Sequence, residues 1–190
     1  MKKIISVVLS MVLFISINCT AFAADSPETP YRNILYNVNR TYGLNLEYES
    51  VDTSKVSLEE YEQFITSVAI QQKKLCQLIL QRELYSQKEI NISVEPRASK
   101  TITKDTWQYG DAFSISATYD VNGVVISNPR NISVNEKKWP IVRYTPNAGS
   151  PTTNIIDSGR TLTVKYYGTY TAIDVSVSNV QLYAEFYYDS

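Results

Sequence analysis

Tyrosine is the residue type in this sequence that is best suited to ligand contact, with 15 tyrosines among 190 residues. An aromatic ring can stack against a sugar ring while its phenol hydroxyl forms hydrogen bonds with sugar hydroxyls. The tyrosines gather towards the C-terminal end. The four that we predict to form a binding surface are Tyr167, Tyr170, Tyr183 and Tyr187.

The direction of two of these tyrosines follows from the alternation of side chains along a strand. Leu182 and Phe186 share one face of the predicted C-terminal strand, and Tyr183 and Tyr187 share the opposite face. If the first face belongs to the core, the two tyrosines point to solvent. The competing interpretation is that tyrosine is simply a good strand former on a half-exposed sheet.

The sequence contains no histidine, which excludes several kinds of catalysis. Ser–His–Asp and Cys–His nucleophilic sites and the ordinary histidine-based zinc sites cannot be built. A glycosidase needs two facing carboxyl groups, about 5 Å or 6.5–9.5 Å apart. The acids of the second half are dispersed and show no spacing that predicts such a pair; they are Asp105, Asp111, Asp120, Glu136, Asp157, Asp174 and Glu185. We therefore predict no catalytic residues.

Motifs for metals and cofactors are also missing from the sequence. It has no D-x-D-x-D calcium loop, no glycine-rich phosphate loop and no dinucleotide fingerprint, so we predict neither a metal ligand nor a cofactor. The two cysteines are Cys19, inside the leader described next, and Cys76. A single remaining thiol cannot form an intramolecular disulfide. Because Cys76 falls on or near a helical apolar stripe, we expect it to be buried.

The first 23 residues have the pattern of a secretory signal peptide. Lys2 and Lys3 precede an apolar run over residues 4–17, and Ala21-Phe22-Ala23 forms an A-x-A cleavage site. The run is shorter than the about 20 apolar residues that span a bilayer. We therefore expect a secreted protein that is extracellular or associated with the cell envelope. The lack of a disulfide and the short leader suit a Gram-positive bacterium.

Residues 24–88 show the apolar spacing of helices. Thr29 is predicted to cap a first helix that has Pro30 at its first position and ends at Gly43. A connector over residues 45–55 then leads to a second helix. We expect the two helices to form a helical hairpin.

The second predicted helix begins at Ser57, which forms a capping box with Glu60, and runs to about Tyr85. One apolar stripe covers its residues 61–79. If the rest of the chain does not cover this stripe, the helix would bind a partner or a second copy. Either way, the stripe must be buried.

Residues 89–190 alternate with a period of two, which is typical of strands. The residues predicted to share one face of a strand are Ile90, Ile92 and Val94; Phe113, Ile115, Ala117 and Tyr119; Leu162, Val164 and Tyr166; and Val180, Leu182, Ala184 and Phe186. Asn122-Gly123 predicts a type I′ hairpin. Asn128-Pro129, Pro146-Asn147 and Ser158-Gly159 predict further turns.

Seven to nine short strands with no helix between them indicate an antiparallel β-sandwich, immunoglobulin-like or jelly-roll. The predicted fold class is α+β, with a signal peptide over residues 1–23, a helical hairpin region over 24–88 and a β-sandwich domain over 89–190. Trp107 and Trp139 flank turn-like segments, and we expect them to plug the ends of the sandwich; the alternative is that they mark a binding site carried by loops.

This layout resembles the small secreted proteins of unknown function that are common in Gram-positive, spore-forming bacteria. The resemblance rests on the patterns of residues 39–46, 54–61, 159–164 and 180–186. These are packing and capping patterns over most of the mature chain. The resemblance implies a secreted helical and β-sandwich protein, but no activity and no site.

The charge of the chain bears on whether it can bind nucleic acid or anionic lipid. The whole chain has a formal charge of −1, and loss of the two leader lysines makes the mature chain slightly more acidic. A nucleic-acid surface needs a basic stripe, so we predict no nucleic-acid partner. Nothing in the charge predicts attraction to anionic lipid, and we predict no transmembrane segment in the mature chain.

We predict a non-enzymatic extracellular or envelope-associated protein that binds cell-wall polysaccharide or a protein partner. The alternative is a carbohydrate-binding module with a surface tyrosine platform. A pore-forming protein, suggested by the amphipathic residues 169–181, and a small hydrolase are weaker alternatives.

Overall fold

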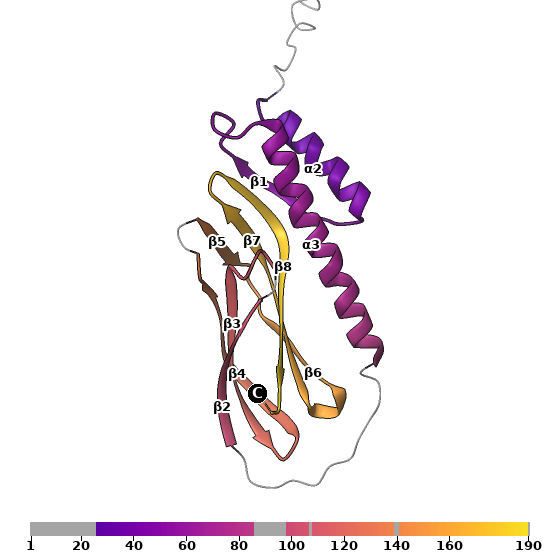
Figure 1. Ribbon diagram of the computed structural model, residues 1–190, viewed down its shortest axis with the longest axis vertical. Helices are drawn as coiled ribbons and strands as arrows, with labels where there is room; N and C mark the ends of the chain where they lie inside the picture. Colours follow the sequence, from indigo (N-terminus) through magenta and orange to yellow (C-terminus); the bar gives the residue numbers. More distant parts are fainter. Residues whose placement is uncertain (1–25, 86–97, 107, 139–140, 190) are drawn as a thin grey trace, which may run out of the picture.

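The computed structural model describes residues 26–85, 98–106, 108–138 and 141–189. The described residues form two helices and eight strands, and the fold is α+β (Figure 1). In chain order the elements are α2 (Thr29–Tyr42), β1 (Glu47–Val51), α3 (Leu58–Tyr85), β2 (Ala98–Asp105), β3 (Phe113–Asn122), β4 (Val125–Glu136), β5 (Val142–Pro146), β6 (Thr152–Ile156), a short 3-10 turn (Asp157–Gly159), β7 (Thr161–Ala172) and β8 (Val175–Tyr187). The predicted signal peptide, the strand predicted at Ile90–Val94, Trp107 and Trp139 lie outside the described residues.

The strands form two antiparallel sheets that share one apolar core. The first has the order β1-β8-β7-β5, with β6 also paired to β7, and the second has the order β2-β3-β4. The core includes Phe113 and Ile115 of β3 together with Leu162 of β7 and Leu182 of β8, all fully buried. The shared faces predicted for β3, β7 and β8 are confirmed, and each of them faces this core.

The local sequence sets two of the helix termini, the start of α3 and the end of α2. The Ser57 hydroxyl accepts the amide of Glu60 at 3.2 Å, and the Glu60 carboxylate accepts the amide of Ser57 at 2.9 Å, which confirms the capping box. Gly43 closes α2 in the left-handed conformation, with φ 67°. Thr29 is the first residue of α2 and not its cap, because Glu28 occupies the cap position, where its side chain makes no capping hydrogen bond and instead pairs with Arg32.

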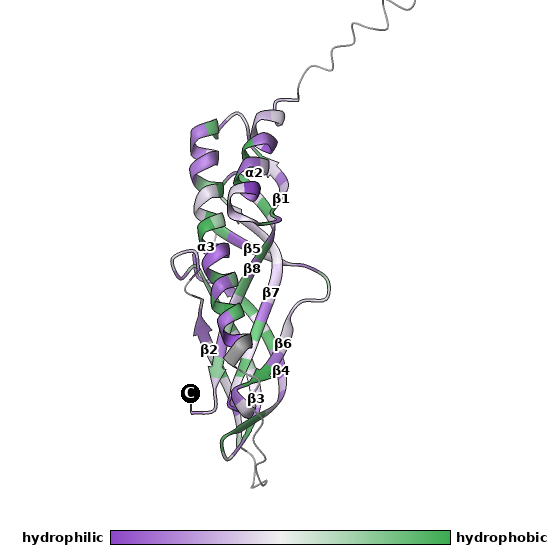
Figure 2. Cartoon of the chain, turned by 90° about the vertical axis from the view of Figure 1, so that its right-hand side faces the viewer, coloured by the Kyte–Doolittle hydropathy of each residue, from purple (hydrophilic) through white to green (hydrophobic). Residues whose placement is uncertain are grey.

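Helix α3 runs beside β8 (Figures 1 and 2). The chain itself buries most of the apolar stripe of this helix. Tyr61 and Ile65 join the main core, while Leu75 and Ile79 form a second cluster with Tyr183 of β8. The stripe is therefore not available for a partner helix or a second copy. None of the described helices has the length and apolar character needed to cross a bilayer.

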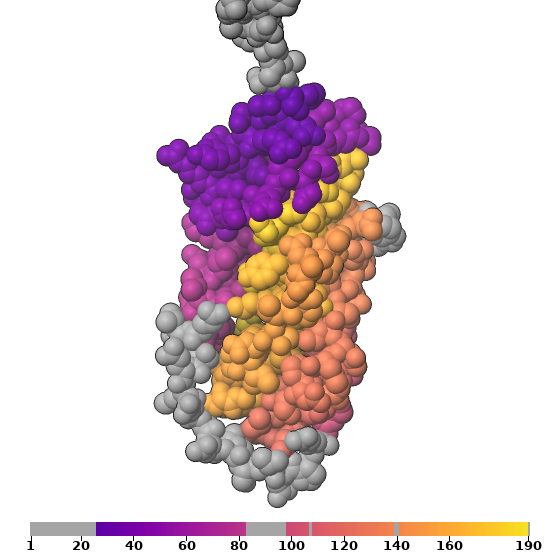
Figure 3. Space-filling model, turned by 180° about the vertical axis from the view of Figure 1, so that it is seen from behind, coloured from indigo at the N-terminus to yellow at the C-terminus, as the bar shows by residue number. Residues whose placement is uncertain are grey.

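The connector between the helices holds a strand that the sequence pattern did not predict. β1 pairs with β8 over Glu47–Val51, opposite Val175–Ser178. Only Val51 among its residues is buried, so no apolar alternation marks it in the sequence. Seen from behind, the N-terminal helix and its connector cover one end of the molecule, next to β8 (Figure 3).

Two of the turn predictions need correction. Asn122 pairs with Val125, so the β3–β4 loop is Gly123-Val124, and only Gly123 has positive φ. Glycine at the first loop position is the type II′ pattern and not the predicted type I′. Asn128 and Pro129 lie within β4 and not in a turn. β3 and β4 shift register opposite this segment, and Asn128 takes positive φ, so the proline sits at an irregularity of an edge strand.

Candidate functional site

A pocket of about 310 Å³ opens where the end of α3 meets β2 and β8. We call it the seam pocket, because it lies between strands of the two sheets. Three elements supply its described lining: Leu78 and Arg82 from α3, Lys104 and Asp105 from β2, and Tyr183, Ala184, Glu185 and Tyr187 from β8. It is the candidate functional site because charged, aromatic and apolar side chains converge on it.

One carboxylate organises the β8 side of the pocket. Tyr183 donates its hydroxyl to Oε1 of Glu185 at 2.7 Å, and Tyr187 donates to Oε2 at 2.5 Å. Nη2 of Arg82 lies 3.0 Å from the same Oε2 and reaches across from α3. The three β8 residues alternate along the strand, so they share its outer face. Both oxygens of Glu185 are therefore occupied.

The protonation states of these groups follow from burial and from the Glu185 charge. Burial, with the hydrogen bond to Glu185, raises the pKa of Tyr187 to about 12. The same causes raise the pKa of Tyr183. Burial is the largest single cause acting on Arg82 and would lower its pKa, but the charges of Glu185 and Tyr187 and the hydrogen bond to Glu185 together raise that pKa. Near neutral pH both phenols thus remain hydrogen-bond donors and Arg82 keeps its charge.

The β2 side of the pocket carries a second pair of charges. Asp105 forms an ion pair with Lys137 at 2.7 Å. Lys104 is half-buried and points inward from the same face of β2 as Ile102. Its Nζ lies 5.9 Å from the centre of the Tyr187 ring. Among the residues that the structure describes, no carboxylate lies within ion-pair distance of Lys104.

The four predicted tyrosines do not form one exposed surface. Tyr183 is 3% exposed and Tyr187 is half-buried, although both do point away from the sheet core as predicted. The expectation that they face solvent is wrong for Tyr183, because α3 covers this face of β8. Tyr170 is also buried and stacks on Tyr109, with ring centres 4.4 Å apart. Tyr167 remains 43% exposed, but on the opposite face of β7 from Tyr170.

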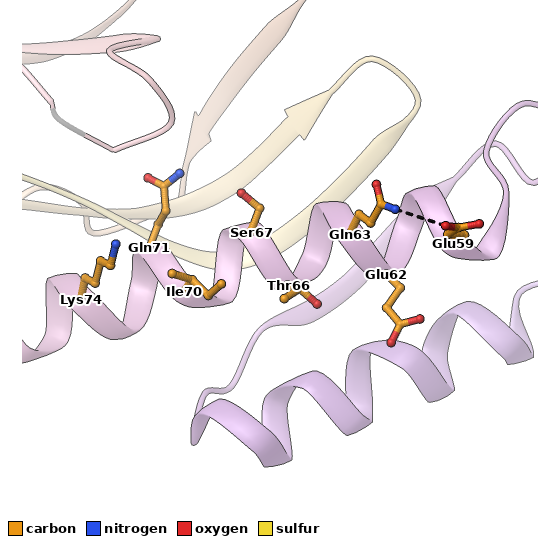
Figure 4. A pocket seen from close by; sticks show the side chains of 8 residues that line it. All are labelled: Glu59, Glu62, Gln63, Thr66, Ser67, Ile70, Gln71 and Lys74. Carbon is orange, nitrogen blue, oxygen red and sulfur yellow. Dashed lines mark hydrogen bonds between the residues drawn. The ribbon is translucent and has the colours of Figure 1, made fainter.

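A larger and more open groove of about 800 Å³ follows the side of α3 (Figure 4). Its described lining is mostly polar: Glu59, Glu62, Gln63, Thr66, Ser67, Ile70, Gln71 and Lys74. Gln63 donates to Glu59 at 3.4 Å, and Glu62 points from the helix towards the side opposite Ser67. The side chains diverge from a single helix, so they do not converge on one ligand atom.

The acids and the thiol are placed as follows. Asp105 and Glu185 both line the seam pocket, but each is already ion-paired to a cation. Within the described part of the chain, no three acidic or cysteine side chains gather as metal ligands would. Cys76 is exposed, which corrects the expectation that it is buried. Cys76 follows Leu75 on α3, but its side chain projects from a different side of the helix than the residues that face β8.

Sequence reasoning identified part of this site and missed the rest. Tyr183 and Tyr187 were predicted, and the alternating series Tyr183-x-Glu185-x-Tyr187 was a usable signal for Glu185. Arg82, Lys104 and Leu78 were missed, because only the packing of α3 and β2 beside β8 brings them together.

No family model and no curated protein matches the chain. Among solved structures, a 2.75 Å crystal structure of the hypothetical protein lmo2686 from Listeria monocytogenes EGD-e is a distant match, with a TM-score of 0.23 and 12% sequence identity. The match covers 52% of this chain and 85% of that chain.

Proposed function

We propose that this is a secreted, non-enzymatic protein that binds a ligand of the extracellular space or cell envelope in its seam pocket. The observation that carries the proposal is the convergence of Arg82, Lys104 and Tyr187 from three different elements on one pocket. Lys104 in particular lies there without a described carboxylate partner. An inward cation of this kind suits ligand contact better than it suits packing.

The geometry favours binding over catalysis. A general acid or base must have a proton or a lone pair available to the substrate. Glu185 is instead held by two phenols and one guanidinium, and Asp105 is paired with Lys137. These contacts fix the walls of the pocket, which is the requirement of a binding site.

The export of the protein is part of the same proposal. The Lys-Lys, apolar and A-x-A pattern of residues 1–23 supports secretion, and the lack of disulfide chemistry supports a Gram-positive envelope. Wall polysaccharide is the ligand class that we favour. A protein partner that reaches the same pocket is the alternative, and a pore-forming role has no comparable support.

The finer classification of the fold also belongs to this proposal. Two antiparallel sheets that face each other across one core support a β-sandwich, immunoglobulin-like or jelly-roll in type. Packing between α2 and α3 supports a helical hairpin that has β1 inserted in its connector.

The direct test is retention of the mature protein, residues 24–190, on purified cell-wall polysaccharide. Lys104→Glu reverses a charge inside the seam pocket, and we expect it to abolish retention. Lys74→Glu makes the same change on α3 outside this pocket, and we expect retention to persist. Tyr167→Ala tests the exposed-tyrosine alternative.

If only Tyr167→Ala loses retention, the binding site lies on the surface of β7 and not in the seam pocket. If folded wild-type protein is not retained at all, wall polysaccharide is not the ligand. The same variants would then be screened against protein partners captured from the envelope.

A further inference from the structure

The unpaired hydrogen-bonding capacity of the seam pocket consists mainly of cationic donors. A guanidinium has five N–H donors, and the bonds of Arg82 to Glu185 and Tyr187 use only Nη2. Its side chain is 41% exposed, so Nε and Nη1 can reach a ligand. Lys104 has three donors, and no hydrogen bond joins them to any described residue. In contrast, both oxygens of Glu185 are already occupied.

The size and walls of the pocket suit one ring. Its 310 Å³ lies at the lower end of the about 300–1,000 Å³ that is typical of ligand sites. Leu78 and the ring of Tyr187 supply apolar surface, and the cations lie beside that surface. A ligand that matches both features has an apolar ring face and an anionic group at its edge.

We propose that the seam pocket binds an acidic saccharide, a sugar ring that carries a carboxylate, with Lys104 and Arg82 as its cationic contacts. This inference rests on the proposed function and specifies its ligand class. Guanidinium and carboxylate groups match in geometry, and charge-assisted hydrogen bonds are the strongest kind in proteins. Glu185 holds the Arg82 side chain at the mouth of the pocket, which reduces the entropy lost when the ligand binds.

A structural role for Lys104 predicts something different. β2 is an edge strand of its sheet, and an inward lysine on an edge strand can prevent pairing with another chain. In that case, removal of the charge would promote self-association. It would leave any preference among sugars unchanged.

The experiment compares methyl glucuronide with methyl glucoside, two probes that differ in a carboxylate against a hydroxymethyl group. Titrations of the mature protein are followed by amide chemical shifts. We expect the glucuronide to bind about tenfold more tightly, the effect of one charge-assisted contact. A higher salt concentration should weaken binding of the glucuronide and leave binding of the glucoside unchanged.

Variants test whether Lys104 causes the preference for the glucuronide. Lys104→Met should bring the two affinities close together, while Lys74→Met should keep the wild-type ratio. The salt dependence of the wild-type protein decides the matter without a variant if Lys104→Met fails to fold. Sedimentation of each variant reports self-association, which only the structural role of Lys104 predicts.

The outcomes separate this inference from the function on which it rests. Equal affinities for the two glycosides, or a preference that survives in Lys104→Met, would overturn the acidic-saccharide inference. Retention on wall polysaccharide together with either result leaves the proposed function standing. Absence of both glycoside binding and retention would overturn both.

Discussion

Ile173 occupies a backbone position that usually belongs to glycine. It is the first residue of the two-residue β7–β8 loop, with φ 51°, and its side chain is 75% exposed. The β3–β4 loop has the same length, and there the first residue is Gly123, with φ 59°. A β-branched residue is strained at positive φ. Because the Ile173 side chain is mostly exposed, little burial offsets this strain.

This comparison predicts opposite effects of two substitutions. Ile173→Gly should raise the free energy of unfolding by about 1 kcal/mol, because it removes left-handed strain and loses little burial. Gly123→Ala should lower the free energy of unfolding by a similar amount, about 1 kcal/mol, for the converse reason. Urea denaturation measures both. A loss of stability in Ile173→Gly would show that the isoleucine makes a stabilising contact.

Cys76 gives a second test at the scale of a residue. Its exposure on α3 predicts that the folded mature protein reacts with a thiol reagent at a rate close to that of a free thiol. Absorbance of the released chromophore follows the reaction without denaturant. Reaction only after unfolding would mean that α3 is rotated from the position described.

At the scale of elements, Gln72 joins α3 to β8 through the backbone. Its side-chain amide accepts the N–H of Gln181 at 2.9 Å and donates to the carbonyl of the same residue at 2.9 Å. β1 pairs only with Val175–Ser178 of β8, so these two backbone groups lie beyond its reach. The Gln72 side chain therefore satisfies backbone groups at the buried edge of β8 that a neighbouring strand would otherwise pair.

We predict that Gln72→Met lowers the free energy of unfolding by about 2–6 kcal/mol, since each of two buried backbone groups left without a partner costs about 1–3 kcal/mol. Gln77→Met is the matched control, because Gln77 is exposed on the same helix. Thermal and urea unfolding would be compared for both variants. Equal stabilities would show that α3 is not anchored through this side chain.

The β2-β3-β4 sheet has its own polar link at Asp120. The carboxylate accepts hydrogen bonds from Arg130 at 2.8 Å, Asn128 at 3.0 Å and Ser99 at 3.1 Å, so it joins all three strands. The Arg130 bond is the main cause that holds the pKa of Asp120 at about 2, below its ordinary 3.8. A pKa that is lower in the folded state stabilises the fold above the unfolded value.

The stabilisation by Asp120 is therefore complete above about pH 5 and is lost as pH falls through about 2. We expect Asp120→Asn to be less stable than wild type at pH 6, with a difference that shrinks steadily towards pH 2. Unfolding curves across this range measure the difference. A difference that does not change with pH would mean that the charge of Asp120 does not contribute.

At the scale of the whole molecule, local patterns predicted the pieces better than their contacts. The capping box of Ser57 and the inward rows of β3, β7 and β8 depend on neighbours in sequence, and they could be predicted. β1 could not, because its pairing with β8 and not its own composition makes it a strand. The burial of Tyr183 depends on which sheet face α3 covers, and no local pattern records that choice.

The candidate site shows the same division. Strand alternation correctly predicted that Tyr183 and Tyr187 point away from the sheet core. It did not predict whether these side chains are exposed, and the expected exposed tyrosine surface does not form. Packing of the end of α3 against β8 converts that sheet face into a small pocket, and it adds Arg82 to the pocket as a cation. The site is thus a product of the tertiary arrangement.

The most direct test of the seam pocket as the binding site is a map of amide chemical shifts in the mature protein as soluble wall-polysaccharide fragments are added. We expect the largest shifts on Arg82, Lys104 and the β8 segment 183–187, and unchanged shifts along the groove of residues 59–74. Shifts confined to that groove or to Tyr167, with none in the seam pocket, would place the binding site outside the seam pocket.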